Sequence, residues 1–89
     1  MGLDELVNDY KKSIEKYKET PEKKIQKKIL AAEIKIDEIF IENSKNLIYY
    51  FNKIGGTYNT DERIYNAFLY SLEIYQEFIK LKREREEYF

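Results

Sequence analysis

The sequence predicts an all-α fold, an antiparallel bundle of three long helices at about residues 3–19, 21–54 and 60–87. Two observations predict it. Apolar residues recur every three or four positions along most of the chain, and strong helix-breaking signals interrupt that pattern only at Thr20-Pro21 and Gly55-Gly56. A chain of 89 residues has room for one hydrophobic core, so we expect a single helical-bundle domain over residues 1–89.

The first helix is predicted by apolar side chains spaced alternately four and three residues apart, namely Leu3, Val7, Tyr10, Ile14 and Tyr17. At about 100° per residue they fall within one arc of roughly 100°, which is typical of a helix that buries one face. We expect this helix to end near Glu19, because the signals that follow belong to the start of another helix.

The second helix is predicted to start at Pro21, because Thr20 is a good N-cap and a proline is tolerated at the first helical position. Its main apolar line has a mean period near 3.6 residues and comprises Ile25, Ile29, Ala32, Ile36, Phe40, Leu47, Tyr50 and Ile54. Gly55-Gly56 is a typical C-terminal stop signal. Four consecutive polar residues at 43–46 could bend or split this helix, but the apolar line keeps its phase across them, which favours one continuous helix.

The third helix is predicted to begin after a capping box formed by Asn59 and Glu62, with Thr60 as the alternative cap. Its apolar residues cover about 260° of the helix circumference, so neighbours must enclose it. Residues 80–87 alternate in charge, and we expect them to form a solvated end of the helix.

The composition excludes several classes of function. Hydrophobic residues make up 43% and charged residues 37% of the chain, which is typical of a folded, soluble protein. The longest apolar run, Leu47 to Phe51, is far shorter than the roughly 20 residues of a membrane span, and the acidic N-terminus is unlike a signal peptide, so we expect a cytoplasmic protein with no membrane contact. The chain has no Cys and no His, so we predict no enzyme, no catalytic or metal-binding residues and no cofactor.

The helices carry more apolar surface than a three-helix monomer can bury. Short connections make neighbouring helices antiparallel, so the first helix covers only the N-terminal half of the second. The second helix also has a separate apolar line. Two interpretations account for the surplus: two copies form a homodimer with a four-helix arrangement, or the chain breaks at residues 43–46 and folds as a compact four-helix monomer. A groove for a helix of another protein would use the same side chains. The predicted self-association surface consists of Leu30, Ile34, Ile41, Leu47, Ile48, Phe51, Tyr70 and Ile74.

A lysine cluster opens the second helix, at Lys23, Lys24, Lys27 and Lys28. Lysines at a helix N-terminus oppose the dipole and repel one another, so helix stability does not explain them. Between Tyr10 and Lys28 there are eight Lys and three Glu, a net charge of +5 in a chain of net charge −1. The cluster is a candidate contact for phosphates or an acidic partner; the alternative is an ordinary solvated surface. The patch has no Arg, which favours non-specific contact over reading of DNA sequence.

Three other motifs match known sites poorly. Residues 43–60 resemble a helix-turn-helix only weakly, because Asp61 and Glu62 would face phosphates at the start of the recognition helix. Gly55-Gly56-Thr57 lacks the strand and the Lys-Ser/Thr pair of a phosphate-binding loop. The carboxylates of Glu33, Asp37, Glu38 and Glu42 lack the His of di-metal bundles and are expected to be surface or ion-pair residues. We therefore expect a non-catalytic protein-protein interaction or small regulatory protein, homodimeric, with non-specific nucleic-acid binding through the lysines as the alternative.

Overall fold

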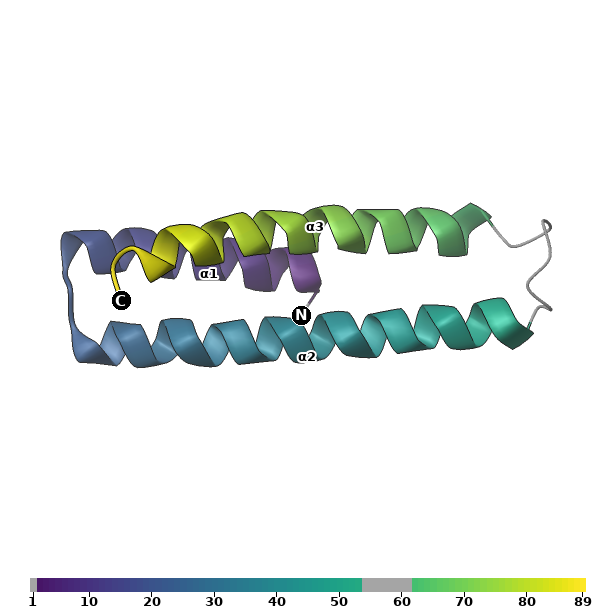
Figure 1. The fold of residues 1–89 in the computed structure, drawn as a ribbon, viewed down its shortest axis with the longest axis horizontal. Coiled ribbons are helices and arrows are strands. Elements are labelled where there is room, and N and C mark those ends of the chain that lie inside the picture. The colour runs from purple at the N-terminus through teal and green to yellow at the C-terminus, as the bar shows by residue number, and fades with distance from the viewer. Residues whose placement is uncertain (1, 54–61) are drawn as a thin grey trace.

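The computed structural model describes residues 2–53 and 62–89, and it contains three helices. Helix α1 spans Leu3–Glu19, α2 spans Lys23–Lys53 and α3 spans Glu62–Glu86 (Figure 1). Both α1 and α3 run antiparallel to α2, so the predicted antiparallel bundle of three long helices is confirmed.

Helix α1 buries the predicted face. Leu3, Val7, Tyr10 and Ile14 are all buried, and Tyr17 is half-buried at the end of the same line. The backbone amide of Thr20 donates to the carbonyl of Lys16 at 2.9 Å, which closes the last turn. The helix therefore ends at Glu19 as expected, and it does so before the proline.

Helix α2 begins two residues later than predicted. The carbonyl of Glu22 accepts hydrogen bonds from the backbone amides of Ile25 and Gln26, both at 3.1 Å, so Glu22 occupies the cap position and Pro21 precedes the helix. Ile25 is the first buried residue of the helix.

Helix α2 continues without a break through residues 43–46. The alternative of a split helix and a compact four-helix monomer is therefore wrong. Asn43 and Ser44 are half-buried within the helix, and the apolar line that precedes them resumes in phase at Leu47. The expected turn at Gly55-Gly56 and the cap at Asn59 lie outside the described residues.

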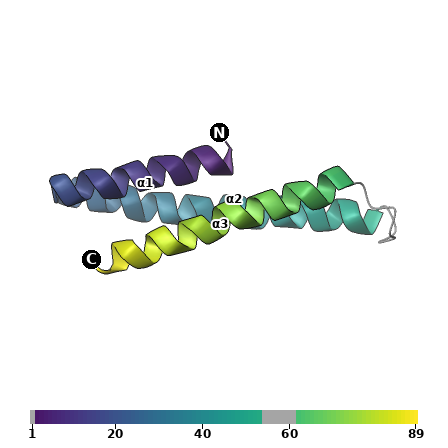
Figure 2. The same cartoon turned by 90° about the horizontal axis from the view of Figure 1, so that it is seen from above.

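The lengths of the helices divide the molecule into two parts. At ~1.5 Å per residue, the 17 residues of α1 reach about 25 Å and the 31 residues of α2 about 46 Å. We call α1, residues 23–40 and residues 73–86 the three-helix end, and residues 41–53 and 62–72 the two-helix arm. Figure 2 shows α3 crossing α2 obliquely into this arm, beyond the N-terminus of α1.

The hydrophobic core lies at the three-helix end. Its buried residues are Leu3, Val7, Tyr10, Ile14, Ile25, Ile29, Ile36 and Phe78. The rings of Tyr10 and Phe78 meet edge to face at 5.2 Å, and Phe40 stacks on Tyr75 at 4.0 Å at the border of the arm. The radius of gyration, 15.9 Å, exceeds the ~12 Å of a compact domain of this length, because the arm extends beyond the core.

Candidate functional site

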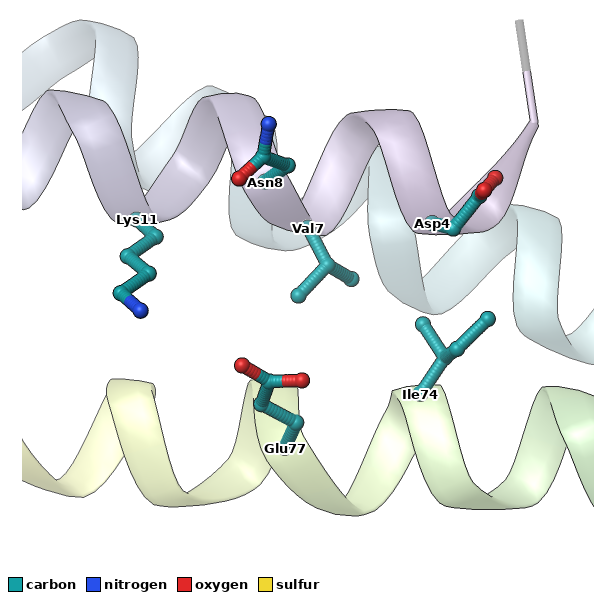
Figure 3. A pocket seen from close by; sticks show the side chains of 6 residues that line it. All are labelled: Asp4, Val7, Asn8, Lys11, Ile74 and Glu77. Atoms are coloured by element: carbon teal, nitrogen blue, oxygen red, sulfur yellow. The ribbon is translucent and has the colours of Figure 1, made fainter.

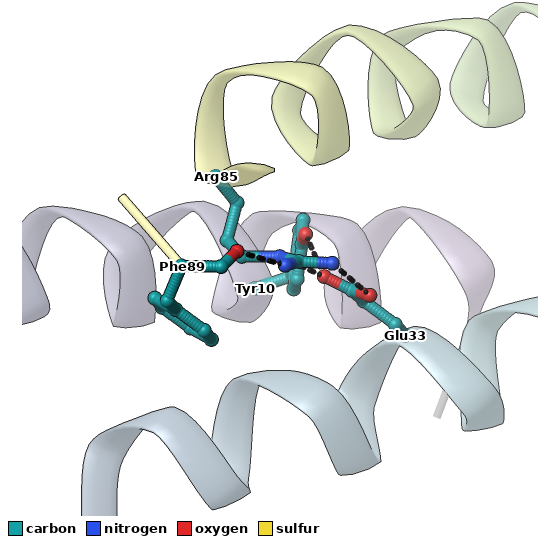
Figure 4. A network of polar contacts seen from close by, with 4 residues as sticks. All are labelled: Tyr10, Glu33, Arg85 and Phe89. Atoms are coloured by element: carbon teal, nitrogen blue, oxygen red, sulfur yellow. Dashed lines mark hydrogen bonds and ion pairs between the residues drawn. The ribbon is translucent and has the colours of Figure 1, made fainter. Parts of the chain in front are cut away.

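A polar network joins all three helices inside the core. The hydroxyl of Tyr10 donates to Oε2 of Glu33 at 2.6 Å (Figure 4). Arg85 donates two hydrogen bonds to the same carboxylate, from Nε to Oε2 at 2.8 Å and from Nη2 to Oε1 at 2.9 Å. Its Nη1 donates to the carbonyl of Phe89. Glu33 is 6% exposed and Arg85 9%, so the pair is shielded from water.

This network is closed, which indicates a structural role. Burial and the hydrogen bond to Glu33 raise the pKa of Tyr10, and the hydrogen bond to Glu33 raises the pKa of Arg85. Tyr10 is thereby held protonated and Arg85 charged. Among the described residues, no buried side-chain nitrogen or oxygen lacks a hydrogen-bond partner. The carboxylate has both oxygens occupied by its own chain and holds the helices in register.

Sequence reasoning missed this pair. It placed Glu33 among surface or ion-pair residues and Arg85 in a solvated helix end, and the solvated end is wrong for Arg85. Arg85 follows the buried Phe78 by seven residues, so the two share one face of α3. The pair could have been predicted from the opposite charges of Glu33 and Arg85 at core-facing positions of their two helices.

A shallow hollow between α1 and α3 is too small for a typical ligand. Its volume is about 120 Å³, against the ~300–1,000 Å³ of most ligand pockets. The residues that line it are Asp4, Val7, Asn8, Lys11, Ile74 and Glu77 (Figure 3). Within residues 2–53 and 62–89, no three acidic, Cys or His side chains gather to hold a metal ion. No helix in the described part is both long enough and apolar enough to cross a bilayer.

The largest unexplained feature is an apolar stripe on the outer side of α2. Leu30 is 42% exposed, Ile34 61%, Ile41 51% and Ile48 57%. At about 100° per residue, the stripe lies roughly 120–160° around the helix from the core residue Ile36. The separate apolar line expected from the sequence is therefore present, and neither α1 nor α3 covers it.

Helix α3 extends this surface along the arm. Tyr65 and Leu69 are exposed and lie roughly 140–180° around α3 from the buried Phe78. On both helices the exposed residues thus face away from the core that α1 completes. We call the set the apolar face: Leu30, Ile34, Ile41 and Ile48 of α2, with Tyr65 and Leu69 of α3.

The structure divides the predicted self-association residues into groups. Leu30, Ile34, Ile41, Ile48 and Tyr70 are exposed. Leu47 is half-buried, and the side chain of Phe51 lies outside the described part of the chain.

Ile74 does not belong with the exposed residues. It is half-buried, packs against the core and lines the hollow beside Val7, because the N-terminus of α1 reaches its level. Tyr65 and Leu69 were not among the predicted surface residues, although the wide apolar arc of the third helix contains them.

The predicted lysine cluster lies at the opposite end of the molecule from the arm. Lys23, Lys24, Lys27 and Lys28 are all exposed, and none makes an ion pair with another described residue. Four further lysines, at positions 11, 12, 16 and 18, are exposed along α1, which packs beside this part of α2 (Figure 1). Residues 10–28 carry a net charge of +5, but acidic residues elsewhere on the three-helix end, among them Asp4, Glu5 and Asp9, offset it.

Comparison with known proteins adds no relative to this picture. No protein-family model, no curated protein and no solved structure matches the chain.

Proposed function

We propose that this chain is a non-catalytic protein-protein interaction module that associates with a second copy of itself through the apolar face. The observation that carries the proposal is the exposure of six large apolar side chains on α2 and α3, all turned away from the core. A two-helix hairpin with one apolar side needs a further layer, because exposed apolar area costs free energy in proportion to its extent.

The area of the apolar face supports this proposal. If each of its six residues offers ~200 Å² when free, their exposed fractions leave on the order of 600 Å² uncovered. A standard interface buries ~800 Å² per partner, of which ~56–65% is apolar, or roughly 450–500 Å². The face therefore supplies enough apolar area for a stable homodimer before any polar rim is added.

The symmetry of such a dimer is simple. Two hairpins stacked face to face make a four-helix arrangement, and a two-fold axis closes the assembly so that no apolar face is left over. A closed pair fits a small adaptor or regulatory protein better than an open polymer does.

A matched pair of lysine substitutions tests the proposal. Ile41→Lys places a charge on the apolar face, whereas Asn46→Lys places the same charge on the opposite side of α2, where the side chain is already exposed. Light scattering should give the mass of two chains for the Asn46→Lys variant and of one chain for Ile41→Lys, with unchanged helical circular dichroism in both. An Ile41→Lys variant that keeps the dimer mass would contradict the proposal.

A second candidate function is non-specific binding of nucleic acid, and the exposed lysines of the three-helix end favour it. Seven of the eight lysines have no ion-pair or ring partner among the described residues, and the eighth, Lys18, lies over the ring of Tyr88 at 5.3 Å. Unpaired ammonium groups are free to replace the counterions of a phosphate backbone.

The salt dependence of DNA binding tests whether the lysines contact phosphates or only water. Affinity for a generic DNA duplex should fall steeply as salt rises, and changing Lys23, Lys24, Lys27 and Lys28 to Glu should abolish it. No binding at low salt would remove nucleic acid as a partner. The two tests change different residues, so each outcome is read separately from the dimer test.

A further inference from the structure

The apolar stripe of α2 has a regular seven-residue spacing. Ile34, Ile41 and Ile48 follow one another at intervals of seven, so they form one seam along the outer side of the helix. Glu38 follows Ile34 by four residues, and Lys45 follows Ile41 by four. The acid and the base therefore lie on the same flank of the seam, about 10 Å apart at ~1.5 Å per residue.

These two charges have no ion-pair partner among the described residues. Glu38 and Lys45 are both exposed, and neither makes an ion pair with any other described residue. Beside an apolar seam, flanking charges commonly select the partner and its direction through pairs across the interface.

We infer that two copies pair antiparallel along α2, with the two-fold axis at Ile41 and with Glu38 of each copy facing Lys45 of the other. The inference rests on the proposed self-association and adds its direction and register. Ile34 and Ile48 each lie seven residues from the axis. Ile34 of one copy therefore lies level with Ile48 of the other. Glu38 lies three residues before the axis and Lys45 four after it, level to within one residue, or ~1.5 Å.

A parallel pair lacks this match. It brings each residue level with its own counterpart, so Glu38 comes level with Glu38 and Lys45 with Lys45, and no opposite charges meet at the same level. An axis perpendicular to the helices and lying between the hairpins also stacks α2 on α2 and α3 on α3. The seam of α2 is then covered along its whole length.

Cysteine crosslinking tests the direction directly, because the chain has no Cys of its own. Ile41→Cys should form a disulfide with itself in the dimer. Ile34→Cys and Ile48→Cys should crosslink when mixed, whereas neither should crosslink alone, since two such positions lie ~20 Å apart in the antiparallel pair and a disulfide needs Cα atoms within ~7 Å. A disulfide formed by Ile34→Cys alone would overturn the inference in favour of a parallel pair.

Charge exchange tests the register independently. Glu38→Lys and Lys45→Glu should each weaken dimerisation roughly 2- to 30-fold, because two exposed ion pairs are lost in each symmetric dimer. The double variant, and an equal mixture of the two single variants, should restore it. Glu42→Lys makes the same charge change one turn away, outside the pairing, and serves as the matched control.

The outcomes distinguish this inference from the proposed function. A chain that is a monomer overturns both. A dimer in which Glu38→Lys has no more effect than Glu42→Lys, or in which the double variant stays weak, keeps self-association and overturns the Glu38–Lys45 pairing.

Discussion

At the scale of single residues, the carboxylate of Glu33 is the point where the three helices meet. It accepts hydrogen bonds from Tyr10 on α1 and from Arg85 on α3 while it is carried by α2. A buried ion pair adds little net stability, since the cost of removing both charges from water offsets their attraction. The hydrogen bonds of the pair need specific distances and directions, however, and only one axial register of the helices satisfies both oxygens of Glu33.

We predict that breaking the pair costs more than removing it. Arg85→Met leaves a buried carboxylate with only the hydroxyl of Tyr10 and should lower the free energy of unfolding by about 3–5 kcal/mol. The double variant Glu33→Met with Arg85→Met removes both charges and should recover most of that loss. Urea unfolding followed by circular dichroism measures the difference. Additive effects of the two substitutions would show that the pair is not coupled.

Alkaline pH should weaken the fold through the tyrosines. The hydrogen bond from Tyr75 to Asp37 at 2.6 Å, followed by burial, raises the pKa of Tyr75 to about 12, and the pKa of Tyr10 is also raised. A tyrosine whose pKa is higher in the folded state stabilises the fold while it is protonated. That stability is present below the unfolded value of about 10 and is lost as pH rises towards 12.

The measurement is the free energy of unfolding at a series of pH values from about 9 upward. Tyr75→Phe removes the phenol and is the control, and its stability should fall less steeply over the same range. Equal slopes for the two proteins would contradict a role for Tyr75 in the alkaline transition.

At the scale of elements, α2 is the longest helix, and like α3 it runs through both the three-helix end and the two-helix arm. Its continuity across residues 43–46 rests on in-phase apolar residues on both sides and not on the propensity of the polar residues themselves. Asn46 is exposed in this stretch and tests the helix without disturbing the core.

We predict opposite effects of two substitutions at Asn46. Asn46→Pro removes a backbone donor and clashes with the preceding turn, so it should destabilise the protein by about 3 kcal/mol or more. Asn46→Ala should stabilise it by about 0.5 kcal/mol through helix propensity. Thermal unfolding followed by circular dichroism compares them. A proline variant as stable as the alanine variant would mean that α2 is broken at this point.

The sequence predicted the helices well because periodicity and capping signals are local. It predicted that the apolar line through Leu30 and Ile48 is not buried by the three-helix bundle, since that line is separate from the main apolar face of its own helix. It did not predict that Glu33 meets Arg85 or that Ile74 is packed, because these depend on how far α1 reaches along α3. That reach is a tertiary property, and helix length alone does not determine it.

At the scale of the whole molecule, the short first helix decides the shape. The N-terminus of α1 lies level with the middle of α2, so the molecule measures 51 × 20 × 16 Å, with the core at one end and an arm of two helices at the other. The exposed lysine cluster lies at the core end, and most of the apolar face lies on the arm and the adjoining part of α2. The two ends are therefore suited to different contacts.

The mass of the unmodified chain in solution tests the central claim, that a second copy covers the apolar face. Sedimentation equilibrium over a range of concentrations should give twice the chain mass of 10.9 kDa, falling towards a single chain only on dilution. A mass of one chain at every concentration would contradict the account, because the apolar face would then remain open to water.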